Sequence, residues 1–316
     1  MIELSSDSTV THVQVIGIAA ALVLVAGPLL LGLSGLIRTH RTSEGATVES
    51  ATRWNWKLTI TSALIYTLAF NLTFFVQEFF LVLPKAFTPG LRPTLFHNNH
   101  SWEGESPLAS LFQGTGALAT FVTAIICVLL LRRGLGCSTA VRLFLIWMAY
   151  CGFFMALPQV VIGALSSGSD VGMAMDYFHL GAMAKTVAAL VALAAIPPIA
   201  LWLARALLSL AEDTTQIASA RARTRFLFRA ATLPALLAIL LIVPFRMPRE
   251  LVEVVVLPVV VTLIGTAWMQ AGASRIGGVK AEEGGSGAGS IAWLLCAVLL
   301  LLLVFQLLLR PGIRFY

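Results

Sequence analysis

The chain has 316 residues, of which 58% are hydrophobic and only 11% are charged, and its mean hydropathy is +0.90. Soluble domains carry roughly a quarter charged residues, so this composition excludes a soluble globular protein and predicts an integral membrane protein. The net charge is +6, but the basic residues lie in loops between apolar runs, which is typical of membrane topology and not of nucleic-acid binding.

Long apolar runs bounded by charged residues predict about eight transmembrane helices in an all-α bundle, because about 20 apolar residues cross a bilayer core roughly 30 Å thick. The predicted spans cover residues 13–37, 58–83, 108–131, 142–166, 181–204, 229–245, 251–269 and 290–309. The sixth span is short, and an alternative is a re-entrant hairpin with the seventh. The whole chain, 1–316, is then one membrane domain.

Lys and Arg alternate between the loops. The loops after odd-numbered spans contain fourteen of them and the loops after even-numbered spans contain five. Basic residues stay on the cytoplasmic side, so we expect both termini to be external and the protein to be a multi-pass protein of a cell inner membrane. The basic stretch 221–230 marks the cytoplasmic face in this interpretation, although it could also contact anionic head groups. The Gly/Ser-rich segment 270–290 is predicted to be a flexible cytoplasmic loop.

The second span carries an ionisable residue near its outer end. Glu78 shares a helix face with Asn71, and intramembrane carboxylates usually face the bundle interior and mark functional sites. The alternative is that Glu78 pairs with Lys85 or reaches toward the interface. Pro84 is expected to end this helix.

The external polar loop 84–107 contains the sequence TLFHNNHSWEGES. If its centre forms a helical turn, His97 and His100 lie at i and i+3 and can share one divalent metal such as zinc, with a carboxylate as third ligand. The alternative is an ordinary interfacial loop, in which Trp102 belongs to the aromatic belt.

The third span begins with a small-residue patch of Gly114, Gly116 and Ala117, which predicts close helix packing. The next external loop, 166–181, predicts a short helix with Asp170 as its N-cap, and this helix carries Asp176 and His179. The candidate metal ligands are His97, His100, Glu78, Asp170 and His179, and the candidate catalytic residues are Glu78 and Asp176. Capping and interfacial hydrogen bonds are the alternative roles of the acids and of His179.

The clustering of polar residues at one membrane face favours a metal-assisted, membrane-embedded hydrolase. Its expected partners are membrane lipids and a membrane-borne or lipid-linked substrate, and no nucleic acid is expected. Prolines within spans four to seven favour a transporter instead, because broken helices often form transport sites. A non-catalytic membrane scaffold is the third alternative. The motifs H-E-x-x-H, G-x-S-x-G and the Walker A loop are absent from the sequence.

Overall fold

The computed structural model describes residues 3–43, 54–134, 138–249, 251–281 and 290–316. The described part contains eight helical segments long and apolar enough to cross a membrane, and they confirm the predicted all-α class. These segments are Thr11–Ile37, Trp56–Ala86, Leu108–Arg132, Thr139–Leu165, Ala182–Leu208, Ala220–Arg246, Glu253–Arg275 and Ile291–Leu309. The sixth is 27 residues long and begins nine residues before the predicted start, so it is not the short span that the sequence indicated.

The first span joins α1 (Glu3–Ala21) and α2 (Gly27–Ser43) through a π-helical turn at Leu22–Ala26. The next spans are α3 (Trp56–Ala86), α4 (Leu108–Phe112) with α5 (Thr115–Arg132), α6 (Thr139–Leu165) and α8 (Ala182–Leu208), and α7 (Asp170–Tyr177) precedes α8. The remaining spans contain α9 (Ala220–Leu227), α10 (Leu233–Arg246), α11 (Leu257–Gly272) and α12 (Ile291–Leu303), with π-helical turns at Phe228–Thr232, Val252–Val256 and Val304–Leu309. Short 3-10 turns cover Thr214–Ile217 and Ala273–Arg275.

Helices α3 and α6 form the centre of the bundle. Of an apolar 18-residue stretch in each helix, 72% is buried in α3 and 78% in α6, whereas only 11% is buried in the first and last spans. Several polar groups in this centre are hydrogen bonded to neighbouring helices. The Trp147 indole donates to Ser62 Oγ at 3.0 Å, and the Tyr150 hydroxyl donates to the carbonyl of Thr262 at 2.6 Å. Such pairing is required where no water can replace a missing partner.

The predicted small-residue patch is confirmed as a close contact. A Cβ added at Gly116 would lie 2.8 Å from Leu81 Cγ of α3, and one added at Gly114 would lie 2.8 Å from Ala174 Cβ of α7. Helix α5 therefore approaches both α3 and α7 closely at the end of the bundle that carries the polar loops.

The segment with His97 and His100 is a β-hairpin and not the helical turn that we predicted. Strands β1 (Arg92–Leu95) and β2 (His100–Glu103) pair with Leu95 opposite His100, and the Phe96 amide donates to the Asn99 carbonyl at 2.8 Å. Residues 97 and 98 form the turn, because the neighbouring Asn residues favour turn conformations over helix. Strand β3 (Ile313–Arg314) adds to the other edge of β1.

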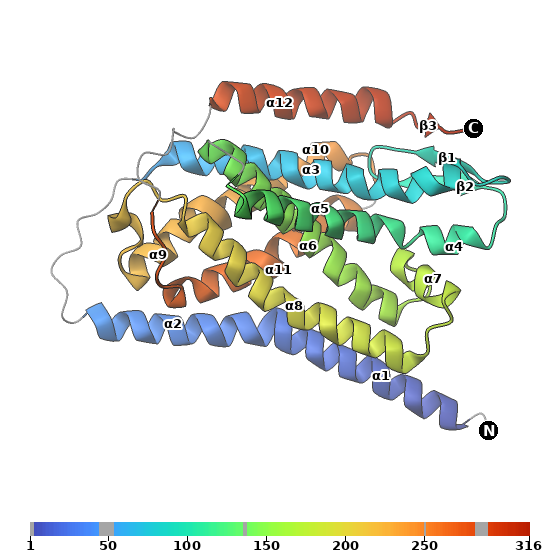
Figure 1. Ribbon diagram of the computed structural model, residues 1–316, viewed down its shortest axis with the longest axis horizontal. Coiled ribbons are helices and arrows are strands. Elements are labelled where there is room, and N and C mark those ends of the chain that lie inside the picture. Colours follow the sequence, from blue (N-terminus) through green and yellow to red (C-terminus); the bar gives the residue numbers. More distant parts are fainter. Residues whose placement is uncertain (1–2, 44–53, 135–137, 250, 282–289) are drawn as a thin grey trace.

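Both described chain ends lie at the end of the bundle that carries the hairpin and α7 (Figure 1). Strand β3 pairs with β1, and the Thr186 hydroxyl at the start of α8 lies 3.1 Å from His12 Nδ1 of α1. The described termini therefore share one end of the bundle with loops 84–107 and 166–181, and the external placement of that end stays a prediction.

Three local predictions need correction. Pro84 lies within α3, which continues to Ala86, because a proline in the last turn costs few helical hydrogen bonds. The N-cap of α7 is Ser169, whose Oγ accepts from the Gly172 amide at 3.2 Å, and Asp170 is the first helical residue. The first residues of the predicted loop 270–290, up to Arg275, are still helical, and residues 282–289 lie outside the described part of the chain.

Candidate functional site

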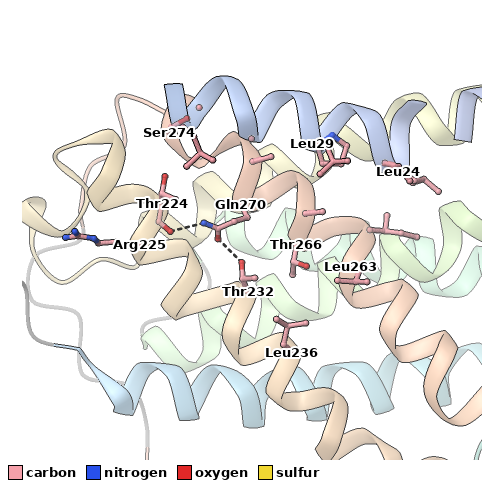
Figure 2. Close-up of a pocket in the computed structure, with 18 of the residues that line it drawn as sticks. Leu24, Leu29, Thr224, Arg225, Thr232, Leu236, Leu263, Thr266, Gln270 and Ser274 are labelled. Atoms are coloured by element: carbon pink, nitrogen blue, oxygen red, sulfur yellow. Dashed lines mark hydrogen bonds between the residues drawn. The ribbon is translucent and has the colours of Figure 1, made fainter. Parts of the chain in front are cut away.

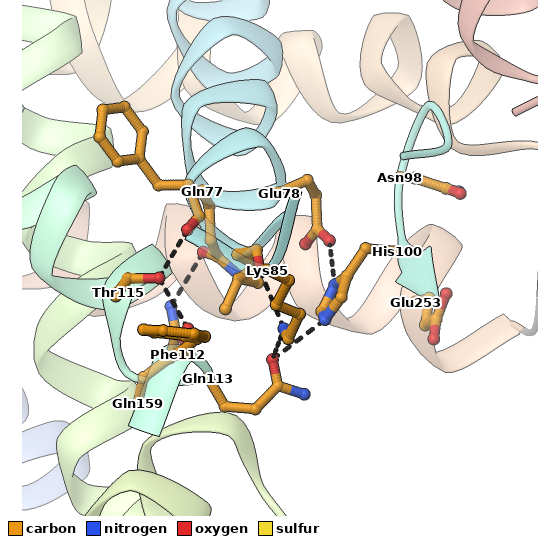
Figure 3. A network of polar contacts seen from close by, with 12 residues as sticks. Gln77, Glu78, Lys85, Asn98, His100, Phe112, Gln113, Thr115, Gln159 and Glu253 are labelled. Atoms are coloured by element: carbon orange, nitrogen blue, oxygen red, sulfur yellow. Dashed lines mark hydrogen bonds and ion pairs between the residues drawn. The ribbon is translucent and has the colours of Figure 1, made fainter. Parts of the chain in front are cut away.

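Glu78 and His100 form a buried acid–imidazole pair beneath the hairpin (Figure 3). Glu78 Oε2 of α3 lies 2.9 Å from His100 Nδ1 of β2, and each side chain is only 6% exposed. The predicted approach of His100 to Glu78 is therefore confirmed. Register places the imidazole there, because His100 is the first residue of β2 and faces the end of α3.

Lys85 and Gln113 extend this pair into a network. The fully buried Lys85 ammonium donates to the Leu81 carbonyl and to Gln113 Oε1, both at 2.9 Å, and lies 4.5 Å from the centre of the Trp102 ring. Gln113 Oε1 also lies 3.0 Å from His100 Nε2. Lys85 thus does not contact Glu78 directly, as the alternative interpretation of Glu78 required; it fixes the amide that contacts the histidine.

The hydrogen-bonding pattern assigns a proton to the Glu78–His100 pair. An ammonium can only donate, so its contact with Gln113 Oε1 makes that oxygen an acceptor. His100 Nε2 must then donate to Gln113, which leaves Nδ1 facing Glu78. Either Nδ1 carries a second proton and donates to the carboxylate, or Glu78 is protonated and donates to Nδ1. In both forms one proton lies between the two side chains.

Asp170 belongs to the same electrostatic environment. Burial raises the pKa of its carboxyl and the charge of Glu78 raises this pKa further, whereas the charges of His100 and Lys85 lower it. No hydrogen bond or ion pair among the described residues joins Asp170 to Glu78 or His100, so their predicted meeting stays a prediction. A carboxyl with a raised pKa is a stronger base when it is ionised.

Two further amides lie on the inner side of the pair. Gln159 Nε2 of α6 donates to Gln77 Oε1 at 2.9 Å and to the Met155 carbonyl at 3.0 Å. Gln77 precedes Glu78 on α3, so these contacts join α3 to α6 beside the acid and restrict its movement. Asn71, which the sequence placed on the same face as Glu78, donates instead to the Thr67 carbonyl of its own helix at 2.8 Å.

His97 faces a different group of residues. Its side chain is buried, and both ring nitrogens lack a hydrogen-bond partner among the described residues. Burial lowers the pKa of His97, and the charges of Arg249, Arg310 and Arg246 lower it further, while the Met247 carbonyl opposes this shift. His97 and His100 are therefore separated by the turn and do not share the face that the helical prediction required.

The neighbouring Asn98 connects the hairpin to the sixth and seventh spans. Its Nδ2 donates to the Arg246 carbonyl at 2.6 Å, and its Oδ1 accepts from Arg249 Nε at 3.3 Å. Arg246 Nε donates to the Glu253 carbonyl at 2.6 Å, while Arg249 Nε lies 3.6 Å from Glu253 Oε2. The Arg246 guanidinium also lies 4.1 Å from the centre of the Phe74 ring. Phe74 is one helical turn from Glu78, so this arginine cluster adjoins the acid–imidazole pair.

The other predicted site residues lie elsewhere. Asp176 is exposed and forms an ion pair with Lys185, and His179 is exposed in a left-handed backbone conformation with φ 51°. Among the described residues no group of three or more His, Cys, Asp or Glu side chains is arranged to hold a metal ion. The five predicted ligands are therefore not gathered at one point, and the predicted zinc site is not shown by the part of the chain that the structure describes.

Sequence reasoning missed Gln113, Asn98 and Arg246. Gln113 stands beside the glycine patch, where the sequence signals only helix packing. Arg246 lies at the end of the sixth span, where a basic residue is ordinary. The one signal in the sequence was that Arg246 and Arg249, at and just after the end of the sixth span, belong to the side of the membrane where basic residues are depleted.

Comparison with protein-family models, curated proteins and solved structures gave no match to this chain.

Proposed function

We propose that the protein is a membrane-embedded hydrolase that uses the Glu78–His100 pair as a general acid and Asp170 as a general base. The single observation that carries this proposal is the buried contact between Glu78 and His100, whose other ring nitrogen contacts the Gln113 oxygen that Lys85 also holds. A proton held by two groups next to a carboxyl of raised pKa is the arrangement that acid–base catalysis needs.

The proposed reaction is hydrolysis of an ester. The Asp170 carboxylate accepts a proton from water, and the water oxygen bonds to the electrophilic centre of the ester. The bond to the leaving-group oxygen then breaks, and that oxygen receives the proton of the Glu78–His100 pair. Transfer of the proton from Asp170 back to the pair completes the cycle, so one water molecule is consumed and no other reagent is needed.

The surroundings support a membrane-borne, anionic substrate. The cluster of Arg246 and Arg249 adjoins the pair, because the Arg246 guanidinium lies on the Phe74 ring one helical turn from Glu78. Guanidinium groups bind phosphate and carboxylate oxygens through paired hydrogen bonds. A lipid-linked phosphate ester would place its anionic group at this cluster and its chain in the membrane, with the hairpin excluding water from the pair.

The proposed location is a cell inner membrane, with both termini, the hairpin and α7 on the external side, as the distribution of basic residues indicates. A metal-assisted reaction would need a third ligand beside Glu78 and His100. Asp170 is the nearest candidate by its electrostatic influence, so a metal at this place would share residues with the acid–base site. We favour the acid–base reaction because the hydrogen bonds that Glu78 and His100 already make explain how these two polar side chains can be buried.

The test is hydrolysis by the purified protein in nanodiscs that contain phosphatidylglycerol, a polyprenyl phosphate and a long-chain carboxylic ester, with products identified by mass spectrometry. We expect one of these to be cleaved. Glu78→Gln, His100→Gln and Asp170→Asn should each reduce the rate by about 10²- to 10⁴-fold, which is the usual contribution of general acid–base groups.

Each variant has a matched control at an exposed site. The control for Asp170→Asn is Asp176→Asn, which changes an exposed acid on the same helix. The control for His100→Gln is His179→Gln, which changes another histidine of the external loops, and the control for Glu78→Gln is Glu103→Gln, which changes an exposed acid of the hairpin. All three should retain the wild-type rate. Equal losses in the controls, or no hydrolysis of any substrate by the wild type, would contradict the proposal. Proton flux into proteoliposomes that is lost only with His100→Gln would support the transporter alternative.

A further inference from the structure

The hairpin closes the acid–imidazole pair off from its surroundings. The Glu78 and His100 side chains are each 6% exposed, and the Gln113 and Lys85 side chains beside them are 4% and 0% exposed. Glu78 and Lys85 lie on α3 and Gln113 joins α4 to α5, whereas His100 lies on a hairpin that belongs to no span. A substrate therefore reaches the pair only after part of this wall moves, and the hairpin is the part that no span carries.

A hollow on the other half of the bundle does not lead to the pair. It has a volume of about 1110 Å³ and opens between α2, α9, α10 and α11, and two of its polar lining residues, Thr232 and Gln270, are hydrogen bonded to each other at 2.8 Å (Figure 2). None of Glu78, His100 and Gln113 lines it. Entry to the pair is thus expected from the side of the hairpin.

Two glycines that lie against each other bound the hairpin. Gly90 precedes β1 with a φ of 87°, and Gly104 follows β2 with a φ of 92°. A Cβ added at Gly104 would lie 1.9 Å from the Gly90 carbonyl oxygen. Both ends of the hairpin therefore pass through one point, in a backbone conformation that favours glycine. A few adjacent residues of this kind can absorb the backbone rotation of a moving segment.

Strand β3 holds the outer edge of the hairpin. The Phe315 amide donates to the Pro93 carbonyl of the segment that forms β1 at 3.1 Å, and Arg314 lies opposite Thr94. These contacts are a short piece of sheet, so they can open without unfolding a span.

The segment before β3 is fixed to the bundle. Gln306 Nε2 donates to the carbonyls of Pro244 and Met247 at 2.7 and 2.9 Å, and the Phe305 ring lies 5.5 Å from the Phe245 ring of α10. Separation of β1 from β3 therefore moves the hairpin, while β3 stays with the bundle.

We propose that residues 92–103 form a lid over the Glu78–His100 pair, which pivots at Gly90 and Gly104 and is latched by β3. Opening breaks the contacts of the hairpin with α3 and exposes the pair. The role of the lid in admitting an ester rests on the hydrolase proposed above, but the movement itself does not depend on that reaction.

The experiment measures how fast diethyl pyrocarbonate, which modifies accessible imidazoles, reacts with His100 in the full-length protein in phosphatidylcholine nanodiscs. Peptide mass spectrometry gives the rate, and His179, which is exposed, is the internal reference for access of the reagent. We expect slow modification of His100 in the wild type, because the reagent reaches it only while the lid is open.

A disulfide between Thr94→Cys and Arg314→Cys locks the lid to its latch. Since Pro93 and Phe315 are hydrogen bonded, Thr94 and Arg314 are a non-hydrogen-bonded pair. The Cα atoms of such a pair are about 4.5 Å apart, which suits a disulfide. Oxidation should slow His100 modification by about 30-fold or more, and reduction should restore it.

The background for this variant carries Cys137→Ser and Cys296→Ser, and the two cysteines that remain, Cys127 and Cys151, are buried. The matched control is a disulfide within the hairpin, between Thr94→Cys and Ser101→Cys, which lie opposite each other in β1 and β2. It should leave the rate at His100 unchanged, because the hairpin moves as one unit.

A second variant tests the hinge without cysteines. Gly104→Ala places a methyl group against the Gly90 carbonyl in the closed lid, so it should speed His100 modification by about 10-fold. The control is Gly134→Ala, at a φ of 67° with nothing within 4 Å of an added Cβ, which should have no effect on His100.

Three outcomes overturn the lid: no modification of His100 in the wild type, modification as fast as that of His179, or equal rates in the two oxidised variants. For an ester that the wild type cleaves, oxidation of the Thr94–Arg314 variant should also abolish hydrolysis. Modification rates that follow the lid while no ester is cleaved contradict the hydrolase alone and support the lid. Hydrolysis that persists in the oxidised Thr94–Arg314 variant contradicts the role of the lid in admitting substrate.

Discussion

Two buried nitrogen-bearing side chains at the hairpin end of the bundle illustrate opposite ways of tolerating burial. The Lys85 side chain is fully buried, and its terminal nitrogen donates to two oxygens and lies over the Trp102 ring. His97 has no hydrogen-bond partner among the described residues, and burial together with the charges of three arginines lowers its pKa. An imidazole in such surroundings is stable only in its neutral form.

His97 therefore predicts a loss of stability in acid. Its pKa is lowered in the folded protein, so below about pH 6.5, the ordinary histidine value, the unfolded chain binds a proton that the folded chain does not. Stability should be constant above that pH and should fall as the pH drops toward the lowered pKa. His97→Gln should reduce this slope, as measured by apparent Tm between pH 8 and pH 5 in detergent. His179→Gln should keep the wild-type slope, and an unchanged slope in His97→Gln would refute the assignment.

At the scale of elements, close helix contacts depend on particular glycines. Gly152 of α6 is the clearest case, because an added Cβ would lie 2.5 Å from the Thr120 carbonyl oxygen and 2.8 Å from Ala124 Cβ of α5. Gly17 of α1 is the opposite case, with nothing within 4 Å of an added Cβ. The same residue type therefore has a packing role in one helix and none in another.

Replacing these two glycines by alanine separates packing from helix propensity. Gly152→Ala should destabilise the protein by about 1–3 kcal/mol, because the backbone of α5 must move to admit the methyl group. Gly17→Ala should be neutral or stabilising by up to about 1 kcal/mol. Unfolding in a graded detergent mixture, followed by circular dichroism, measures both. Equal effects of the two substitutions would contradict the α5–α6 packing described above.

At the scale of the whole molecule, the bundle is polarised between its two ends. One end holds the hairpin, α7, both described termini and the buried acid–base network, and the other holds the basic helix α9 (Figure 1). The number of spans explains how the termini meet the hairpin, since an even number of crossings returns the chain to the side where it began. Strand β3 then fastens the last residues to β1.

This polarity predicts the results of topology mapping. Reporter fusions at Gly45 and Gly284, in loops that follow odd-numbered spans, should report the cytoplasm, and a fusion at Gly104 beside the hairpin should report the exterior. A reporter active only outside and a second active only inside give each site its own control. A cytoplasmic signal at Gly104 would place the acid–base network on the inner face and would remove the basis for an external substrate.

The sequence alone determined the all-α class and the approximate positions of eight apolar helices, because hydropathy acts residue by residue and needs no knowledge of neighbours. It also placed Glu78, His100 and Asp170 in one region. The tertiary structure alone decided the partners. The hairpin register directs His100 to Glu78 and leaves His97 near arginines of the sixth span, of the loop after it and of the C-terminal segment. A shift of one residue in the pairing of β1 with β2 would turn the side chains of the shifted strand to the opposite face. Gln113 and Arg246 joined the network through packing between helices distant in sequence, and side-chain contacts of that kind leave no periodic signal in the chain.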